Sequence, residues 1–187
     1  MILASEFRKG RKILFQNEPY MVMEFVHVKP GKGGAFMRTK MKNLITGLMR
    51  EETFRTEEKF AVPQLENKDM QYLYKDNDLY NFMDLESYEQ IAFNKSQIEE
   101  VIDLLKEQES YTILYFQNRP ISVTAPMFMN LKVVSAPPGV RGNTAQGAAN
   151  KPVTLETGLV IQAPLFVNEG DVIKVDTRDL QYIERVK

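Results

Sequence analysis

The chain has 187 residues, of which 43% are hydrophobic and 26% charged, with a net charge of −1 and no cysteine. This composition is typical of a folded protein with apolar cores and argues against a disordered or fibrous chain. The lack of cysteine excludes disulfides, thiolate catalysis and thiolate metal sites. The sequence has no apolar run of about 18 residues and no signal-peptide pattern, so we expect a cytoplasmic protein without a membrane partner.

Charge is distributed unevenly along the chain. Residues 1–62 hold twelve Lys/Arg and seven Asp/Glu, residues 63–127 hold five and twelve, and residues 128–187 hold seven and six. The stretch from Phe25 to Arg50 contains six basic residues and no acidic residue. Such a local positive field suits a polyanion such as RNA, although a charge run is more often a solvated face.

The first 62 residues are predicted to form short strands at 12–15, 20–28, 35–44 and 48–55, which together indicate a small antiparallel barrel. In the third of these strands, side chains alternate between two faces. The period of two gives an apolar face and a basic face, the latter formed by Phe36, Arg38, Lys40 and Lys42.

The turn before that strand lies in "HVKPGKGGAF", residues 27–36. It is not a phosphate-binding loop, because Lys32 is followed by Gly33 instead of Ser or Thr. Pro30 stiffens one side of the turn, and the glycines add backbone freedom without side-chain bulk. From the residues alone, the turn is either a solvated hairpin tip or a lysine presented to a partner.

Pro63 marks a boundary, because proline cannot donate a hydrogen bond within a sheet and the charge balance reverses after it. Strands are predicted next at 70–75, 79–84, 111–116 and 120–124, with a short helix that begins near Ser96 and buries Ile98, Val101, Ile102 and Leu105. Further strands are expected at 130–135, 153–167, 171–176 and 181–186. Residues 136–152 show no periodic pattern, and a loop of this length is usually functional or mobile.

The sequence shows no catalytic or metal-binding constellation. Its one histidine, His27, has no cluster of carboxylates at ligand spacing and no obvious serine partner. We therefore expect no metal, no cofactor and no catalytic residue, and hence a protein that is not an enzyme.

Motifs in order along the chain resemble the bacterial elongation factor P family, whose members bind the ribosome and relieve stalling at consecutive prolines. The matching segments are "FRKG", "HVKPGKGGAF", "MQYLY", "FMDLESYEQI", "PISVTAP", "KPVTLETGLVIQAPLFVNEGDVIKVDTRD" and "YIERV". The resemblance implies an all-β fold of three small β-barrels. These are an SH3-like (KOW-type) domain over 1–63, an OB-fold domain with the short helix over 64–127, and a second OB-fold domain over 128–187. The related eukaryotic and archaeal initiation factors have only one OB domain, so the third unit argues against them.

The resemblance also implies partners and site residues. The expected partners are the 70S ribosome with its rRNA, peptidyl-tRNA and a lysine-modifying enzyme, with the chain acting as a monomer. Lys32 matches the family's modified residue and lies in a loop expected to contact tRNA and ribosome, formed by Pro30, Gly31, Lys32, Gly33 and Gly34. A lysine there leaves β-lysine addition, an aminopentanol-type addition or no modification. Phosphate contacts are expected at Lys29, Arg38, Lys40 and Lys42.

Two further regions are implied in the third unit. The family's codon-side loop, usually Gly-Asp-Thr, corresponds here to Gly142, Asn143, Thr144 and Ala145. Asn143 keeps a hydrogen-bond acceptor, adds donors and removes a negative charge, which puts the base preference in doubt. Tyr182 and Arg185 match family positions near RNA, although Tyr182 also fits a core position.

Three alternatives remain at this point. An elongation factor P-like paralogue shares the three domains but lacks the lysine loop, so "KPGKGGAF" favours the factor itself. A general single-strand RNA-binding protein would use its barrels without specificity for the ribosome. An enzyme that forms a Schiff base on Lys32 would need a desolvated lysine, and the flanking glycines argue against burial.

Overall fold

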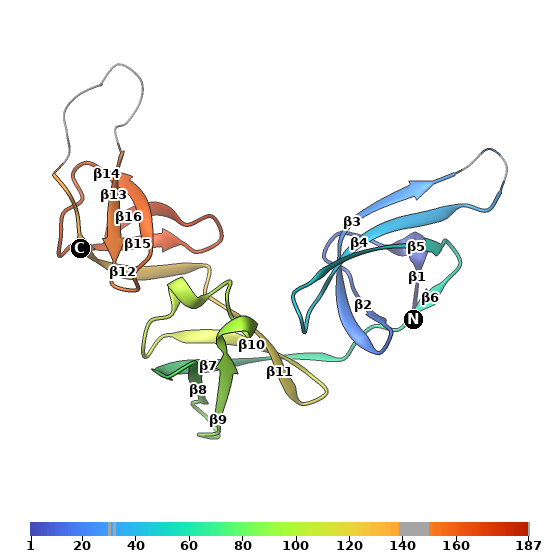
Figure 1. The fold of residues 1–187 in the computed structure, drawn as a ribbon, viewed down its shortest axis with the longest axis horizontal. Coiled ribbons are helices and arrows are strands. Elements are labelled where there is room, and N and C mark those ends of the chain that lie inside the picture. The colour runs from blue at the N-terminus through green and yellow to red at the C-terminus, as the bar shows by residue number, and fades with distance from the viewer. Residues whose placement is uncertain (30, 32, 139–149, 187) are drawn as a thin grey trace, which may run out of the picture. The chain divides into compact units, whose positions relative to one another are not determined.

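The computed structural model describes residues 1–29, 31, 33–138 and 150–186. In these residues the protein is almost entirely β, with only short 3-10 segments as helix (Figure 1). None of the described helices is long and apolar enough to cross a membrane. The chain divides by its internal contacts into one unit of residues 1–68 and 113–122 and another of residues 69–112 and 123–187.

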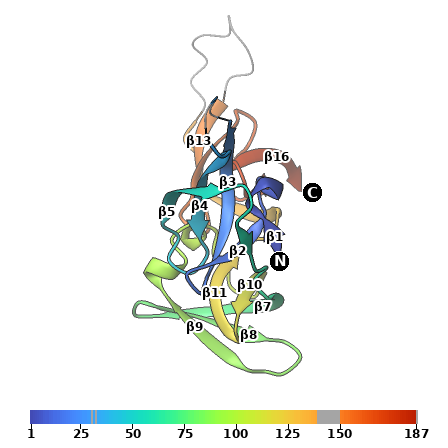
Figure 2. The same ribbon diagram turned by 90° about the vertical axis from the view of Figure 1, so that its right-hand side faces the viewer.

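The first sheet is antiparallel, with the order β2-β3-β4-β5. Its strands, all predicted from the sequence, are β2 (Lys12–Phe15), β3 (Glu18–Val28), β4 (Phe36–Asn43) and β5 (Met49–Arg55). Figure 2 shows β3 and β4 lying side by side. A separate pair joins β1 (Ile2–Leu3) to β6 (Lys59–Phe60), and the 3-10 segment η1 (Ala4–Glu6) follows β1.

Strand β4 has the two faces that its sequence predicts. Met37 and Met41 are buried in the core of this sheet, whereas Arg38 and Lys40 are exposed. The same core contains Phe7, Phe54 and Phe60, whose rings pack at tilted or edge-on angles with centroids 4.8–6.0 Å apart. Burying each large apolar side chain contributes about 1.5–3 kcal/mol, which fixes the face that β4 turns to solvent.

The second sheet has the order β11-β10-β7-β8-β9. Its strands are β7 (Leu65–Asp76), β8 (Leu79–Asp84), β9 (Gln90–Asn94), β10 (Ser110–Phe116) and β11 (Arg119–Thr124). The sequence reading missed only β9, a five-residue strand in which Phe93 alone is fully buried. Phe82 is in ring contact with Tyr72, Phe93 and Tyr111, and all four rings are buried, so these aromatics pack the core.

The short helix predicted near Ser96 is not confirmed as one continuous helix. The described chain has two 3-10 segments there, η2 (Lys95–Gln97) and η3 (Ile102–Leu104). The capping bond forms two residues earlier than expected, from the Asn94 N–H to Gln97 Oε1 at 2.9 Å. Ile98, Val101 and Leu104 are buried. Their spacing of three residues fits the three residues per turn of a 3-10 helix better than the 3.6 of an α-helix.

The third sheet has the order β14-β13-β12-β15-β16. Its strands are β12 (Phe128–Ser135), β13 (Asn150–Leu155), β14 (Val160–Pro164), β15 (Val172–Asp176) and β16 (Gln181–Val186). The single strand predicted over 153–167 is therefore a hairpin. Its turn contains Gly158, which has a φ of +89° and donates its N–H to the Leu155 carbonyl at 2.8 Å.

Candidate functional site

The candidate site lies at the end of the β3–β4 hairpin. The two strands pair from Tyr20 opposite Asn43 to Val28 opposite Phe36, so residues 29–35 form the connection. Pro30 and Lys32 lie outside the residues that the structure describes. Lys29 and the three glycines of this connection are exposed.

The glycines of the loop differ in backbone conformation and in the space around them. Gly33 has a φ of +125°, a conformation that L-residues rarely adopt. A Cβ added at Gly31 or Gly34 would meet no other atom within 4 Å. The protein's own backbone therefore calls for glycine at position 33, whereas its own atoms leave space for side chains at 31 and 34.

The base of the loop is tied to the end of β5. Thr56 donates from its Oγ1 to the Ala35 carbonyl at 3.3 Å and from its N–H to the same oxygen at 3.4 Å. A groove of about 600 Å³ lies beside this contact and is lined in part by His27, Lys29 and Lys59. The lining of this groove is mainly apolar, and its charged residues have both signs, since Glu57 lines it as well as Lys29 and Lys59.

The basic side chains of β4 that are predicted to contact phosphates have acidic residues beside them on the neighbouring strands. Arg38 Nε is 3.8 Å from Glu51 Oε1, and the two side chains are 59% and 63% exposed. Lys40 is opposite Glu24 on β3 and Glu51 on β5, and Lys42 is half-buried. Exposed ion pairs contribute only about 0.2–1 kcal/mol, so a phosphate can compete for the basic partner. The pairing nevertheless reduces the positive field that the sequence indicates.

In the third sheet the structure brings Tyr182 and Arg185 together around a third residue, Phe166. The Tyr182 and Phe166 ring centroids are 6.4 Å apart, and the Arg185 guanidinium is 5.8 Å from the Phe166 centroid. Arg185 also pairs with Asp171 at 3.5 Å. The sequence reading missed Phe166, which is 57% exposed, because it assigned the residue to a strand. Pro164, where β14 ends, is the signal that a turn follows.

The predicted codon-side residues Gly142, Asn143, Thr144 and Ala145 lie outside the described residues. They fall between the end of β12 at Ser135 and the start of β13 at Asn150. Within the described ranges, no group of three or more His, Asp or Glu side chains is placed to hold a metal ion.

Comparison with known proteins matches three successive segments of the chain. Protein-family models match the elongation factor P KOW-like domain over residues 3–60, the elongation factor P OB domain over 65–123, and the elongation factor P C-terminal domain over 129–185. The full chain is 50% identical to the whole elongation factor P of Alkaliphilus metalliredigens over 186 residues and to that of Ruminiclostridium cellulolyticum over 187. Against the whole protein from Clostridioides difficile the identity is 49% over 186 residues.

A solved structure shares the fold. The structure named eukaryotic translation initiation factor 5A from Methanococcus jannaschii has a TM-score of 0.53 and 21% identity to this chain. The similarity covers 66% of this chain and 95% of the other. The initiation factor thus resembles part of the chain, whereas the elongation factors match all of it.

A KOW-like domain followed by an OB domain, in a chain that matches elongation factors from end to end, defines a translation elongation factor. The relatives are named as translation factors and not as enzymes. The chain belongs to the elongation factor P family. The resemblance seen in the sequence motifs and the all-β fold class are confirmed; that the three segments form three closed barrels stays a prediction.

Proposed function

We propose that this elongation factor binds the ribosome beside the peptidyl-tRNA and promotes peptide-bond formation at consecutive prolines. In this proposal Lys32, extended by a modification, positions the acceptor end of the tRNA. The observation that supports it is the surroundings of the loop: Gly31 and Gly34 have open space where a Cβ would lie, in a chain of this family.

This open space means that packing within the protein does not require glycine at these two positions. A side chain at 31 or 34 would meet open space in the described chain, so intramolecular packing does not call for glycine there, whereas a partner that closes around the loop would. A modifying enzyme that closes around Lys32, followed by a crowded RNA cleft, is such a partner. Glycine gives both of them close access to the lysine without side-chain bulk.

The mechanism follows from the chemistry of proline. Its ring fixes φ and makes the attacking amine secondary, so Pro-tRNA and a nascent chain that ends in proline react from poor geometry. Holding the reacting groups in a productive arrangement can contribute several kcal/mol, up to roughly 7–11 kcal/mol in the best-oriented reactions. The ribosome makes the bond, and Lys32 supplies charge and hydrogen bonds to the acceptor end.

Other residues would contact RNA around this point. Lys29, Arg38, Lys40 and Lys42 contact phosphates in this proposal. Residues 142–145 approach the codon, and Tyr182 and Arg185, joined by Phe166, lie near RNA. The partners are the 70S ribosome, peptidyl-tRNA and a lysine-modifying enzyme, and the chain acts as a cytoplasmic monomer with domains at 1–63, 64–127 and 128–187.

The test replaces the lysine and measures translation of a triproline reporter. We expect Lys32→Ala to fold normally and to lose the rescue, because no amine reaches the tRNA. Lys29→Ala is the matched control in the same loop and should lose much less. Unchanged rescue by Lys32→Ala contradicts the proposal.

Two further measurements complete the test. The intact mass of the natively produced protein, with peptide mapping of residues 29–38, identifies the group on Lys32. Co-sedimentation distinguishes the factor from a general RNA-binding protein. We expect binding to ribosomes with a vacant exit site and little binding to free RNA, and the reverse preference contradicts the proposal.

A further inference from the structure

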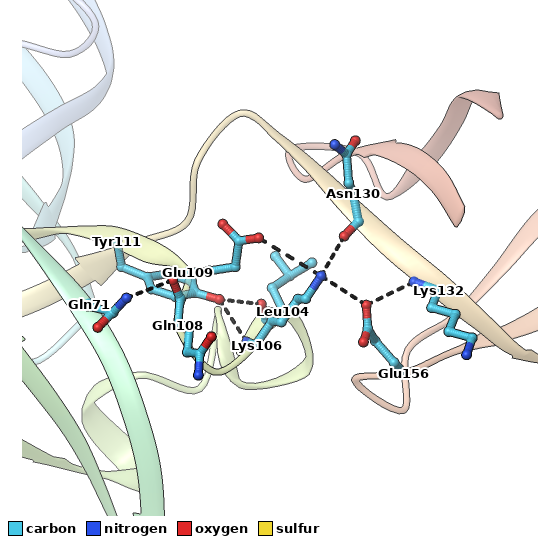
Figure 3. Close-up of polar contacts among 9 residues, drawn as sticks. All are labelled: Gln71, Leu104, Lys106, Gln108, Glu109, Tyr111, Asn130, Lys132 and Glu156. Carbon is cyan, nitrogen blue, oxygen red and sulfur yellow. Dashed lines mark hydrogen bonds and ion pairs between the residues drawn. The ribbon is translucent and has the colours of Figure 1, made fainter. Parts of the chain in front are cut away.

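Lys106 joins two sheets within the unit formed by residues 69–112 and 123–187. It lies between η3 and β10, in a connection of the second sheet. Its Nζ donates to the Asn130 carbonyl at 3.0 Å and is 3.1 Å from Glu156 Oε1, with Glu109 Oε1 at 3.9 Å (Figure 3). Asn130 belongs to β12, and Glu156 follows β13, so both of the nearer acceptors are in the third sheet.

The segment that carries Lys106 is held by Tyr111, a residue of β10 that is 1% exposed. The phenol oxygen accepts the Lys106 N–H at 2.8 Å and donates to the Leu104 carbonyl at 2.8 Å. Burial raises the pKa of Tyr111 to about 12, so the hydroxyl keeps its proton at neutral pH. One buried side chain therefore fixes the backbone on both sides of residue 105 and sets where the Lys106 side chain starts.

The acceptors on the third sheet are also held in place. Glu156 Oε1 accepts the Lys132 N–H at 2.9 Å, and the Glu156 N–H donates to the Lys132 carbonyl at 2.8 Å. Asn130 is paired with Lys174 in the register of β12 and β15. Because both acceptors are fixed by strand backbone, the ammonium meets a preformed site instead of two mobile side chains.

A second set of hydrogen bonds, from Thr177, holds the chain segment that leads from the second sheet into the third. Thr177 donates from Oγ1 to the Pro126 carbonyl at 2.7 Å and from its N–H to the Met127 carbonyl at 3.0 Å. The turn that carries Thr177 is closed by Arg178, which bonds the 5% exposed Asp176 with Nη2 at 2.6 Å and Nε at 3.0 Å. Residues 126 and 127 immediately precede β12, so this contact holds the start of the strand that Lys106 contacts at Asn130.

We propose that Lys106 is a positioning residue, which locks residues 69–112 and the third sheet into one rigid body. An isolated, partly exposed ion pair contributes little, because ordering two long side chains opposes the attraction. Here only the Lys106 side chain has to be ordered, because its acceptors in the third sheet are already held by hydrogen bonds. The Thr177 contact also restricts the residues that lead into β12. The lock holds the third sheet, with Phe166, Tyr182 and Arg185, at one angle to residues 69–112.

Residual dipolar couplings of the full chain test this proposal. We expect amides of β8 and β9 and amides of β13 and β14 to fit one alignment tensor in the unmodified protein. In Lys106→Met the two groups should need separate tensors, while the couplings within each group still fit the same sheet. Glu156→Gln keeps an acceptor for the Lys132 N–H but removes the charge, and it should give a smaller loss of common alignment.

Lys174→Met is the matched control. Lys174 pairs with Glu184 at 3.3 Å within the third sheet and has a side-chain exposure of 35%, close to the 31% of Lys106. It should leave the common tensor unchanged. The proposal is overturned if the unmodified protein already needs two tensors, or if Lys106→Met and Glu156→Gln both keep one. The measurement uses the free protein, so its result does not depend on the proposed action at the ribosome.

Discussion

The described residues of the β3–β4 loop and the segment that contains Lys106 have opposite surroundings. Around the first, Gly31 and Gly34 leave open space and the flanking residues are exposed. Around the second, three oxygen acceptors lie within 3.9 Å of the ammonium. The Lys106 ammonium is thus surrounded by acceptors of its own chain, whereas in our proposal the space beside Gly31 and Gly34 is left for a partner of Lys32.

Because of this contrast, substitutions in the two regions should have different effects. A methyl group added at Gly31 or Gly34 meets open space in the described chain, so its effect is expected in function and not in stability. A change in the 104–111 segment leaves polar groups without partners, so its effect is expected in stability and in the arrangement of the sheets.

Gly34→Ala should reduce triproline rescue without loss of stability. The added methyl group meets no atom of the chain, so we expect the free energy of unfolding to change by less than about 0.5 kcal/mol. If a partner closes around the loop, a small displacement of Lys32 can lower the rate roughly 10–100-fold. Reporter translation and thermal unfolding measure the two effects.

Gly158→Ala is the control for Gly34→Ala. Its φ of +89° makes a side chain costly, by roughly 1–2 kcal/mol, and it lies in the β13–β14 turn. It should lower stability and spare rescue. Equal rescue in Gly34→Ala and the unmodified protein would show that nothing fits closely around the loop.

Tyr111→Phe should destabilise the protein by about 1–3 kcal/mol, because it leaves the Lys106 N–H and the Leu104 carbonyl without their partner. Urea denaturation measures the change. Tyr74→Phe is the control: Tyr74 is 48% exposed, and its change should stay within about 0.5 kcal/mol. A loss in Tyr111→Phe no larger than in the control contradicts the role given to the buried hydroxyl.

Stability at alkaline pH should depend on the same hydroxyl. The pKa of Tyr111 is raised from 10.0 to about 12 by burial, so the unfolded chain loses this proton before the folded chain does. The contribution is complete below pH 10 and is lost as the pH rises towards 12, with a slope of at most about 1.4 kcal/mol per pH unit. Denaturation of the unmodified protein and Tyr111→Phe at several pH values isolates it, and parallel curves for the two proteins would rule it out.

Arg38→Gln should have the smallest effect on stability, below about 0.5 kcal/mol, because the Arg38–Glu51 pair is more than half exposed on both sides. Its effect should lie in binding, where the loss of one phosphate contact weakens the salt dependence of ribosome affinity. Affinity measured at several salt concentrations checks this. An unchanged salt dependence would contradict the phosphate contact and indicate that Arg38 pairs mainly with Glu51.

Much of the strand pattern could be predicted from the sequence because alternation is a local signal. The faces of β4 follow from residues two apart, and the bounds of β8 and β16 agree with their apolar runs. The elements that were not predicted are the short strands β1, β6 and β9, the β13–β14 hairpin and the 3-10 segments. The β13–β14 hairpin looked like one strand because its turn is short, and the 3-10 segments looked helical because four apolar residues also fit a period of 3.6.

The family, the β pattern and the glycine-rich loop around Lys32 could be predicted because motifs, alternation and glycine clusters depend on neighbouring residues. Which charged side chains meet depends instead on how the strands pair and the sheets pack. Glu24 and Glu51 lie along the basic row of β4 because strand pairing puts them there, and Lys106 finds Asn130 and Glu156 through the packing of two sheets. Such contacts join residues tens of positions apart, and nothing in the spacing of one chain segment specifies them.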